Sequence, residues 1–216
     1  MPATTHRPRT VILGTLAVAA AGTLIGVSWT DSASGTQQSV ASTVQNDAAQ
    51  LSAVKAGFTA AIQATRSVDA PPASALGPLA ALANGQVAPQ VGSSVRARQL
   101  TDGAAVLAQH FTPDQAKHEA VALHNAVSNE ADPKFRNLGS GTSKVTFTQV
   151  GVAGATATVQ AQVTVWAKFQ QQQPDGKWTT ANPANVMDYT ATLVKNSAGH
   201  WIVSSLRGDF APGEGP

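Results

Sequence analysis

The feature that most constrains this chain is a run of alternating apolar and polar residues between positions 157 and 169. Every second residue of the run is apolar: Ala157, Val159, Ala161, Val163, Val165, Ala167 and Phe169. Successive side chains of a strand point to opposite faces of a sheet, so the run predicts a long strand with one covered face and one solvated face. This pattern is typical of antiparallel sheets that are covered on one side only.

The half of the chain that precedes this run has a helical period instead. Apolar residues recur at intervals of three and four over 44–66, which predicts one amphipathic helix. A second helix is predicted over 91–110. A third begins at Thr112, which can cap it, and Pro113, which suits its first position. Between the first two helices, the Pro-rich segment 69–90 predicts a loop.

From Lys144 onward the apolar period is two, which indicates strands. The predicted strands are 144–152, 155–173, 185–195 and 200–210. The sequence NSAG at 196–199 has the length and composition of a hairpin turn. Helices followed by hairpin-linked strands predict an α+β fold, in which the helices pack on one face of a curved antiparallel sheet of about four strands.

The N-terminal segment contains twenty-one consecutive uncharged residues between Arg9 and Asp31. A helix of about twenty residues spans the hydrocarbon core of a bilayer, so the run predicts a single transmembrane anchor. Arg7 and Arg9 would lie on the cytoplasmic side under the positive-inside rule, which places the rest of the chain outside. The alternative is a signal peptide that is cleaved after the small residues Ala19–Ala21, which would release a secreted protein.

These patterns divide the chain into five parts. Residues 1–9 form a basic cytoplasmic tail, 10–30 the anchor, 31–43 a small polar linker, 44–210 an extracytoplasmic α+β domain, and 211–216 a flexible C-terminal tail.

The charge of the chain argues against a nucleic-acid partner. Arg7 and Arg9 are two of the fourteen basic residues, and the other twelve balance the twelve acidic residues. The exported part is therefore formally neutral, whereas phosphate binding needs a clustered basic surface. The absence of cysteine also excludes disulfides, thiolate metal sites and a cysteine nucleophile.

The part of the chain that follows the linker resembles a known superfamily. A helical first half, a long alternating strand that ends in an aromatic residue, and the closing hairpin KNSAGHWIVSSLRGDF are similar to NTF2-like (cystatin-like α+β cone) domains. In those domains the last strand often begins with a polar turn, a glycine, one residue and a tryptophan, here Gly199, His200 and Trp201. The resemblance covers roughly residues 44–210.

With the N-terminal segment and an Ala-rich composition typical of high-GC actinobacteria, the chain most resembles the membrane-anchored members of that superfamily. These are the Mce-associated membrane proteins and the VirB8- and TcpC-like components of conjugation machines. The resemblance implies a non-catalytic assembly role, other envelope proteins as partners, and a possible homodimer through the sheet. Catalytic members place acid and base residues inside the cone, but none of their motif residues can be carried over to this chain.

No catalytic or metal-binding motif emerges from the sequence. His118-Glu119 is followed by His124 rather than by a histidine at the spacing of HExxH, so the two imidazoles would lie on different sides of a helix. The best candidates for a pocket are Trp166, Asp188, Tyr189 and His200, which could gather where the sheet curls. A carboxylate beside aromatic rings could act as a base, although the same residues could serve packing and turns alone.

The sequence therefore predicts a non-catalytic, single-pass interaction module that is an accessory part of an envelope transport or secretion assembly. No catalytic residue, cofactor or metal is assigned. The alternative is an NTF2-like pocket, in a secreted or anchored protein, that binds or converts a lipid- or polyketide-like molecule.

Overall fold

The computed structural model describes residues 37–76 and 82–214. The predicted tail, 1–9, and the predicted anchor, 10–30, lie outside these residues. Among the helices of the described ranges, none is both long enough and apolar enough to cross a membrane.

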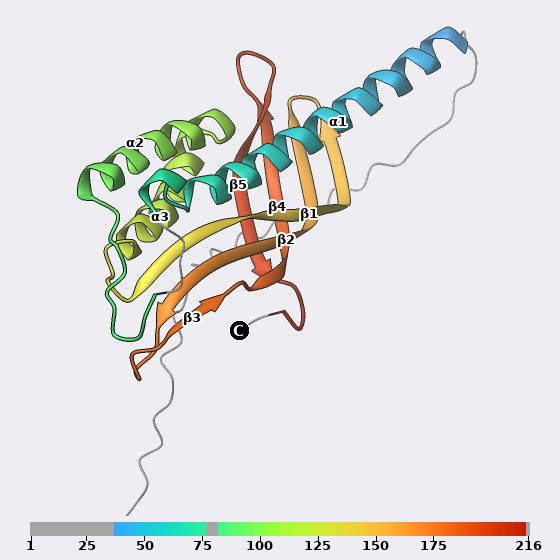
Figure 1. Ribbon diagram of the computed structural model, residues 1–216. Helices are drawn as coiled ribbons and strands as arrows, with labels where there is room; N and C mark the ends of the chain where they lie inside the picture. The colour runs from blue at the N-terminus through green and yellow to red at the C-terminus, as the bar shows by residue number, and fades with distance from the viewer. Residues whose placement is uncertain (1–36, 77–81, 215–216) are drawn as a thin grey trace, which may run out of the picture. The chain divides into compact units, whose positions relative to one another are not determined.

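Three α-helices precede the sheet (Figure 1): α1 is Gln37–Val68, α2 is Ser93–His110 and α3 is Pro113–Asn129. A short 3₁₀ helix, η1, spans Ala73–Ala75. Helix α3 begins at Pro113 as predicted, since proline lacks the N–H that the first turn leaves without a partner. Thr112 occupies the cap position, but its side chain makes no capping hydrogen bond.

The strands form one antiparallel sheet of five strands rather than about four. They are β1 (Phe135–Ala153), β2 (Thr156–Gln172), β3 (Trp178–Ala181), β4 (Ala184–Lys195) and β5 (Trp201–Phe210). The spatial order is β1-β2-β4-β5, and β3 pairs with the end of β2 that β4 leaves open. The turn at 196–199 joins β4 to β5 as predicted. The α+β architecture with helices on a curved antiparallel sheet is thus observed (Figure 1).

Two element bounds differ from the sequence prediction. Helix α1 begins at Gln37, so residues 37–43 are helical where a linker was predicted. Strand β1 begins at Phe135, well before Lys144. Its register against β2 is interrupted three times, at Asn137/Gly139, Thr142/Lys144 and Phe147/Gln149. Each interruption shifts the alternation of the side chains, and this conceals the strand in the sequence.

The hydrophobic core lies between the helices and one face of the sheet. From α1 it takes Val54, Phe58 and Ile62, each at most 1% exposed. The other helices contribute Leu107, Leu123 and Val127, and the alternating apolar residues of β2 supply the floor, from Ala157 to Val163. Along the predicted apolar stripe of α1, Ala48 is exposed, Leu51 is half-buried, and burial begins at Val54 among residues 47–68. The beginning of α1 runs past the edge of the sheet (Figure 1).

Candidate functional site

The four predicted pocket residues do not come together. Tyr189 lies on the helix-covered face of β4, in line with the buried Ala191 and Leu193. Asp188, its neighbour in sequence, therefore lies on the opposite face. Trp166 shares that outer face with Asp188, but Asp188 pairs with Gln162, four residues away from Trp166 along β2. Four residues of strand span about 13 Å, which separates the two side chains.

Trp166 packs against the neighbouring strand. A Cβ atom added at Gly141 would lie 2.8 Å from the indole ring, and one added at Gly139 would lie 3.7 Å from it. The two glycines of β1 therefore leave the space that the ring occupies. Trp166 serves the packing of β1 on β2.

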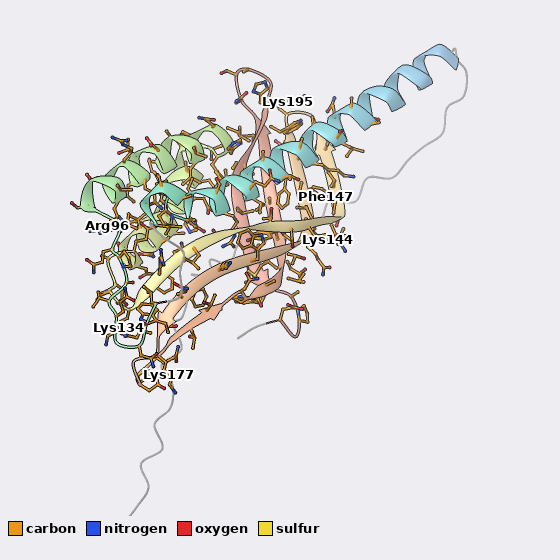
Figure 2. The ribbon with its side chains drawn as sticks, viewed as in Figure 1. Arg96, Lys134, Lys144, Phe147, Lys177 and Lys195 are labelled. Carbon is orange, nitrogen blue, oxygen red and sulfur yellow. The ribbon has the colours of Figure 1, made fainter. Side chains whose placement is uncertain are left out.

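His200 is an exposed residue of the turn between β4 and β5. Its backbone N–H donates to Asn196 Oδ1 at 2.9 Å, and its carbonyl accepts from the Asn196 N–H, also at 2.9 Å. These contacts close the hairpin turn, and Gly199 supplies the positive φ of 81° that the turn requires. Beside this turn, Lys195 at the end of β4 (Figure 2) places Nζ 5.1 Å from the centre of the Trp201 ring.

Asp188 belongs to a polar outer face of the sheet. Its pairing partner on β5 is Asp209, whose carboxylate accepts from Arg207 Nε at 2.9 Å. The exposed Gln160, Gln162 and Thr190 continue this face across β2 and β4. A protein surface of hydroxyl, amide and charged groups is suited to hydrated contacts with another protein.

Tyr189, by contrast, belongs to a polar cluster inside the helix-covered face, here called the α1 cluster and formed by Arg66, Asp69, Glu119 and Tyr189. Arg66 Nη2 donates to Tyr189 Oη at 3.2 Å, and Arg66 Nη1 lies 3.7 Å from Asp69 Oδ2. Glu119 of α3, whose side chain is 15% exposed, accepts from Gln115 Nε2 at 2.6 Å. The hydrogen bond between Arg66 and Tyr189 joins the end of α1 to the middle of β4, and Glu119 of α3 lies near enough for its charge to act on Arg66 and Asp69.

The electrostatics of the α1 cluster are dominated by burial. Burial raises the pKa of Asp69 to about 6, because the attraction of Arg66 offsets only part of the lost hydration and Glu119 adds repulsion. Burial tends to lower the pKa of Arg66, but Tyr189, Asp69 and Glu119 together raise it, so the guanidinium stays charged. The cluster can therefore take up and release one proton near pH 6 at the Asp69 carboxyl group.

The sequence patterns did not mark Arg66 or Asp69, and they drew attention to Glu119 only as part of His118-Glu119, whose spacing to His124 does not match HExxH. The available signal was the spacing of Arg66 and Asp69, which lie three residues apart at the end of an apolar helical stripe. The contact that completes the cluster joins Arg66 to Tyr189, 123 positions later. Such a pairing is set by the fold, and local spacing does not reveal it.

A second buried polar contact joins the ends of the helices. Gln99 Nε2 of α2 donates to Val68 O at 3.2 Å and to Glu130 Oε1 at 3.0 Å. Burial raises the pKa of Glu130, while the hydrogen bond from Gln99 and the charge of Arg96 act in the opposite direction. This contact holds α1, α2 and the end of α3 together.

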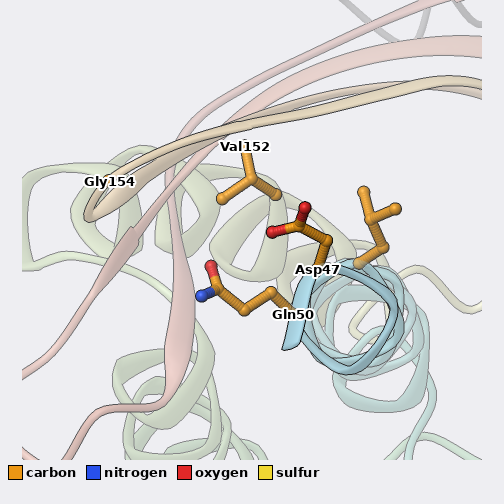
Figure 3. A pocket seen from close by; sticks show the side chains of 5 residues that line it. Asp47, Gln50, Val152 and Gly154 are labelled. Atoms are coloured by element: carbon orange, nitrogen blue, oxygen red, sulfur yellow. The ribbon is translucent and has the colours of Figure 1, made fainter. Parts of the chain in front are cut away.

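Two adjoining surface hollows lie between α1 and the β1–β2 hairpin, and together they are called the α1–β1 groove. The first, about 330 Å³, is lined by Asp47, Gln50, Leu51, Val152 and Gly154 (Figure 3). The second, about 210 Å³, is lined by Leu51, Lys55, Phe147, Thr148, Gln149 and Val150. Leu51 lines both hollows. In Figure 3 the Asp47 and Gln50 side chains extend from α1 toward the hairpin.

Within the described ranges, no three His, Asp or Glu side chains lie close enough together to hold a metal ion.

Comparisons with known proteins give only distant similarities. No protein-family model matches the sequence, and no curated protein matches it. One similar solved structure is the intermembrane space region of the chloroplast protein ARC6, at 12% identity and a TM-score of 0.39, covering 50% of this chain and 78% of that one. An NTF2-like protein involved in plasmid conjugation is 9% identical with a TM-score of 0.25, covering 54% of this chain and 42% of that one. A putative calcium/calmodulin-dependent protein kinase II association domain from Xanthomonas campestris is 12% identical with a TM-score of 0.31, covering 61% of this chain and 99% of that one.

Proposed function

We propose that this chain is a non-catalytic interaction module of the NTF2-like type, anchored in the cytoplasmic membrane with its α+β domain outside. In this proposal it is an accessory part of an envelope transport or secretion assembly, comparable to Mce-associated membrane proteins or to VirB8- and TcpC-like components. Its partners are other envelope proteins and the membrane itself.

The observation that supports a binding role over catalysis is the filling of the interior. Phe58, Phe111, Leu107, Leu123 and Leu193, each at most 2% exposed, occupy the space between the helices and the sheet. A ligand-binding cone needs open volume there, of some hundreds of cubic ångströms for a lipid-sized molecule. The two hollows of the α1–β1 groove lie at the surface instead.

The surface also offers two places where a protein could bind. One is the polar outer face of the sheet around Asp188 and Thr190, and the other is the α1–β1 groove. Protein contacts are commonly built from a partly apolar centre and a polar rim. Leu51 with Val150 and Val152 provides such a centre in the groove, with Asp47 and Lys55 at its margins.

Fractionation of cells that produce the full-length chain, followed by N-terminal sequencing, tests the anchored topology. Membrane-bound protein that retains Arg7 and Arg9 is the expected result. Free protein in the medium that has lost Arg7 and Arg9, with its terminus beyond Ala19, would contradict the anchor and favour the secreted alternative. Because the natural chain has no cysteine, a photo-cross-linking probe can be attached at Thr190→Cys alone. This probe is expected to capture envelope proteins.

A second candidate function is favoured by the α1 cluster. A carboxyl group with a pKa of about 6 that shares an arginine with a tyrosine hydroxyl could act as an acid or base on a small apolar molecule. Saturable binding of an environment-sensitive apolar dye, altered in Asp69→Asn but not in Asp114→Asn, would favour this candidate. Absence of saturable binding would contradict this candidate and leave the interaction module as the proposed function.

A further inference from the structure

The α1–β1 groove has a charge pattern that is complementary to itself. Asp47, Leu51 and Lys55 follow one another at intervals of four on α1 and therefore lie along one side of the helix. Asp47 lines one hollow, Lys55 lines the other, and Leu51 lines both. An acidic and a basic residue are thus equally spaced about a central apolar residue, over about 12 Å of helix.

We infer that the α1–β1 groove is a self-association surface, in which the α1 helices of two copies of this chain pack antiparallel about a two-fold axis near Leu51. In a two-fold interface, each contact between residue i and residue j of the partner occurs twice. Antiparallel packing centred on Leu51 places each Asp47 opposite the partner's Lys55. The same patch is therefore complementary in both copies.

The groove presents what such a contact requires. Leu51 is half-buried and lines the two hollows together with Val150 and Val152, so it offers an apolar centre that a second leucine can cover. Asp47 and Lys55 are both exposed, and Lys55 Nζ lies 5.4 Å from the centre of the Phe147 ring. Figure 2 shows Phe147 on β1, which supplies the wall of the groove opposite α1.

The strand at this edge of the sheet favours a helix over a strand as the occupant. β1 is an edge strand, and three interruptions of its register disturb the regular ladder that another strand would need. Helix α1, by contrast, runs beyond the sheet toward its N-terminus (Figure 1). This inference is independent of the proposed function, because self-association requires neither the anchor nor an envelope partner.

Disulfide cross-linking of the full-length chain tests the inference, since the natural sequence contains no cysteine. Leu51→Cys, at the two-fold axis, is expected to form a covalent dimer under mild oxidation. Val121→Cys on α3, where the natural side chain is 60% exposed, is the matched control and is expected to remain monomeric. Equal cross-linking at the two positions would indicate random collision and would overturn the inference. Cross-linking at Thr190→Cys in place of Leu51→Cys would move the contact to the sheet face and would also overturn it.

Charge reversal gives a second, independent readout. In the Leu51→Cys background, Asp47→Lys places two lysines opposite each other at both symmetry-related contacts, and Lys55→Asp places two aspartates there. Each single reversal is expected to weaken self-association about ten-fold. A mixture of the two variants restores opposite charges at both contacts, so it is expected to cross-link as a heterodimer.

The mixture keeps the test decisive even if a reversal disturbs the helix, because an unfolded variant could not be rescued by its complement. Far-UV circular dichroism of each variant gives the folded fraction directly. Failure of the mixed variants to cross-link above the level of either variant alone, with both folded, would overturn the antiparallel arrangement.

Discussion

At the scale of single residues, Asp69 couples the stability of the domain to pH. Burial raises its pKa to about 6 in the folded chain, against 3.8 for an ordinary aspartate. Between these values the folded state binds the proton more strongly than the unfolded state does, so the contribution of this group to the free energy of unfolding falls as pH rises from about 4 to 6. Two pKa units correspond to about 3 kcal/mol at most.

Asp69→Asn removes this titration and nearly preserves the shape of the side chain. The difference in free energy of unfolding, variant minus natural chain, is expected to increase by about 2 kcal/mol as the pH is raised from 4 to 7. Urea unfolding at a series of pH values measures the difference. Asp114→Asn, whose natural carboxylate is 97% exposed beside Lys117, is the control and is expected to show a much smaller change. A stability difference that is the same at every pH would contradict the assignment to Asp69.

Glu130 offers a second test, one of hydrogen bonding. Gln99 Nε2 donates to one oxygen of its buried carboxyl group, while Gln99 Oε1 and Glu130 Oε2 have no hydrogen-bond partner within the described part of the chain. Glu130→Gln keeps the acceptor and adds donors, so its stability at pH 7 is expected to equal or exceed that of the natural chain. Glu130→Ala leaves Gln99 buried with one fewer partner and is expected to cost about 1–3 kcal/mol.

Denaturant unfolding of the two Glu130 variants separates these outcomes, provided that the free energy of unfolding falls with denaturant concentration at the same slope in both. If Glu130→Gln proves as costly as Glu130→Ala, the negative charge beside Arg96 matters more than the hydrogen bond from Gln99.

At the scale of elements, two helical glycines mark close contacts of different kinds. A Cβ added at Gly57 of α1 would lie 2.6 Å from the Trp201 carbonyl oxygen of β5, whereas one added at Gly103 of α2 would lie 2.6 Å from Leu123 Cδ2. The backbone of a sheet strand cannot move aside easily, but the end of a leucine side chain can rotate. Gly57 therefore fixes how closely α1 approaches the sheet.

Alanine at either position gains about 1 kcal/mol of helix propensity, which makes the two variants a matched pair. Gly57→Ala is expected to lose about 1–3 kcal/mol net, because α1 must shift away from β5. Gly103→Ala is expected to lose less than Gly57→Ala. Thermal and urea unfolding of both variants measure the difference, and a larger loss for Gly103→Ala would show that Leu123 is held more firmly than the strand backbone.

At the scale of the whole molecule, the sequence predicted the elements that follow a regular period and missed those that break it. The alternation of β2 and the turn at 196–199 were predicted because each is a local pattern. The first part of β1 was missed because Gly139, Gly141 and the register shifts disturb its period, and β3 was missed because it has only four residues. Of the α1 cluster, only Tyr189 was a candidate beforehand. Its partners meet it through contacts between distant segments, which periodicity does not encode.

The connection between α2 and α3 joins the helices to the sheet. Phe111, 1% exposed, forms a parallel bridge with Val203 of β5, and the Thr112 N–H donates to Val203 O at 2.8 Å. The same phenylalanine lies in the core formed by α1 and β2. Because one core serves both the helices and the sheet, residues 37–214 are expected to unfold in a single cooperative transition.

Phe111→Ala is expected to lower the free energy of unfolding by about 3–5 kcal/mol, through lost burial and the cavity left behind. Tryptophan fluorescence, which includes the buried Trp201 on β5, and far-UV circular dichroism, which is dominated by the helices, should shift to lower denaturant concentration together. Val121→Ala, at an exposed position of α3, should shift neither signal. Two separate transitions in Phe111→Ala would show instead that the helices and the sheet are stabilised independently, and that the core between them contributes less than its burial indicates.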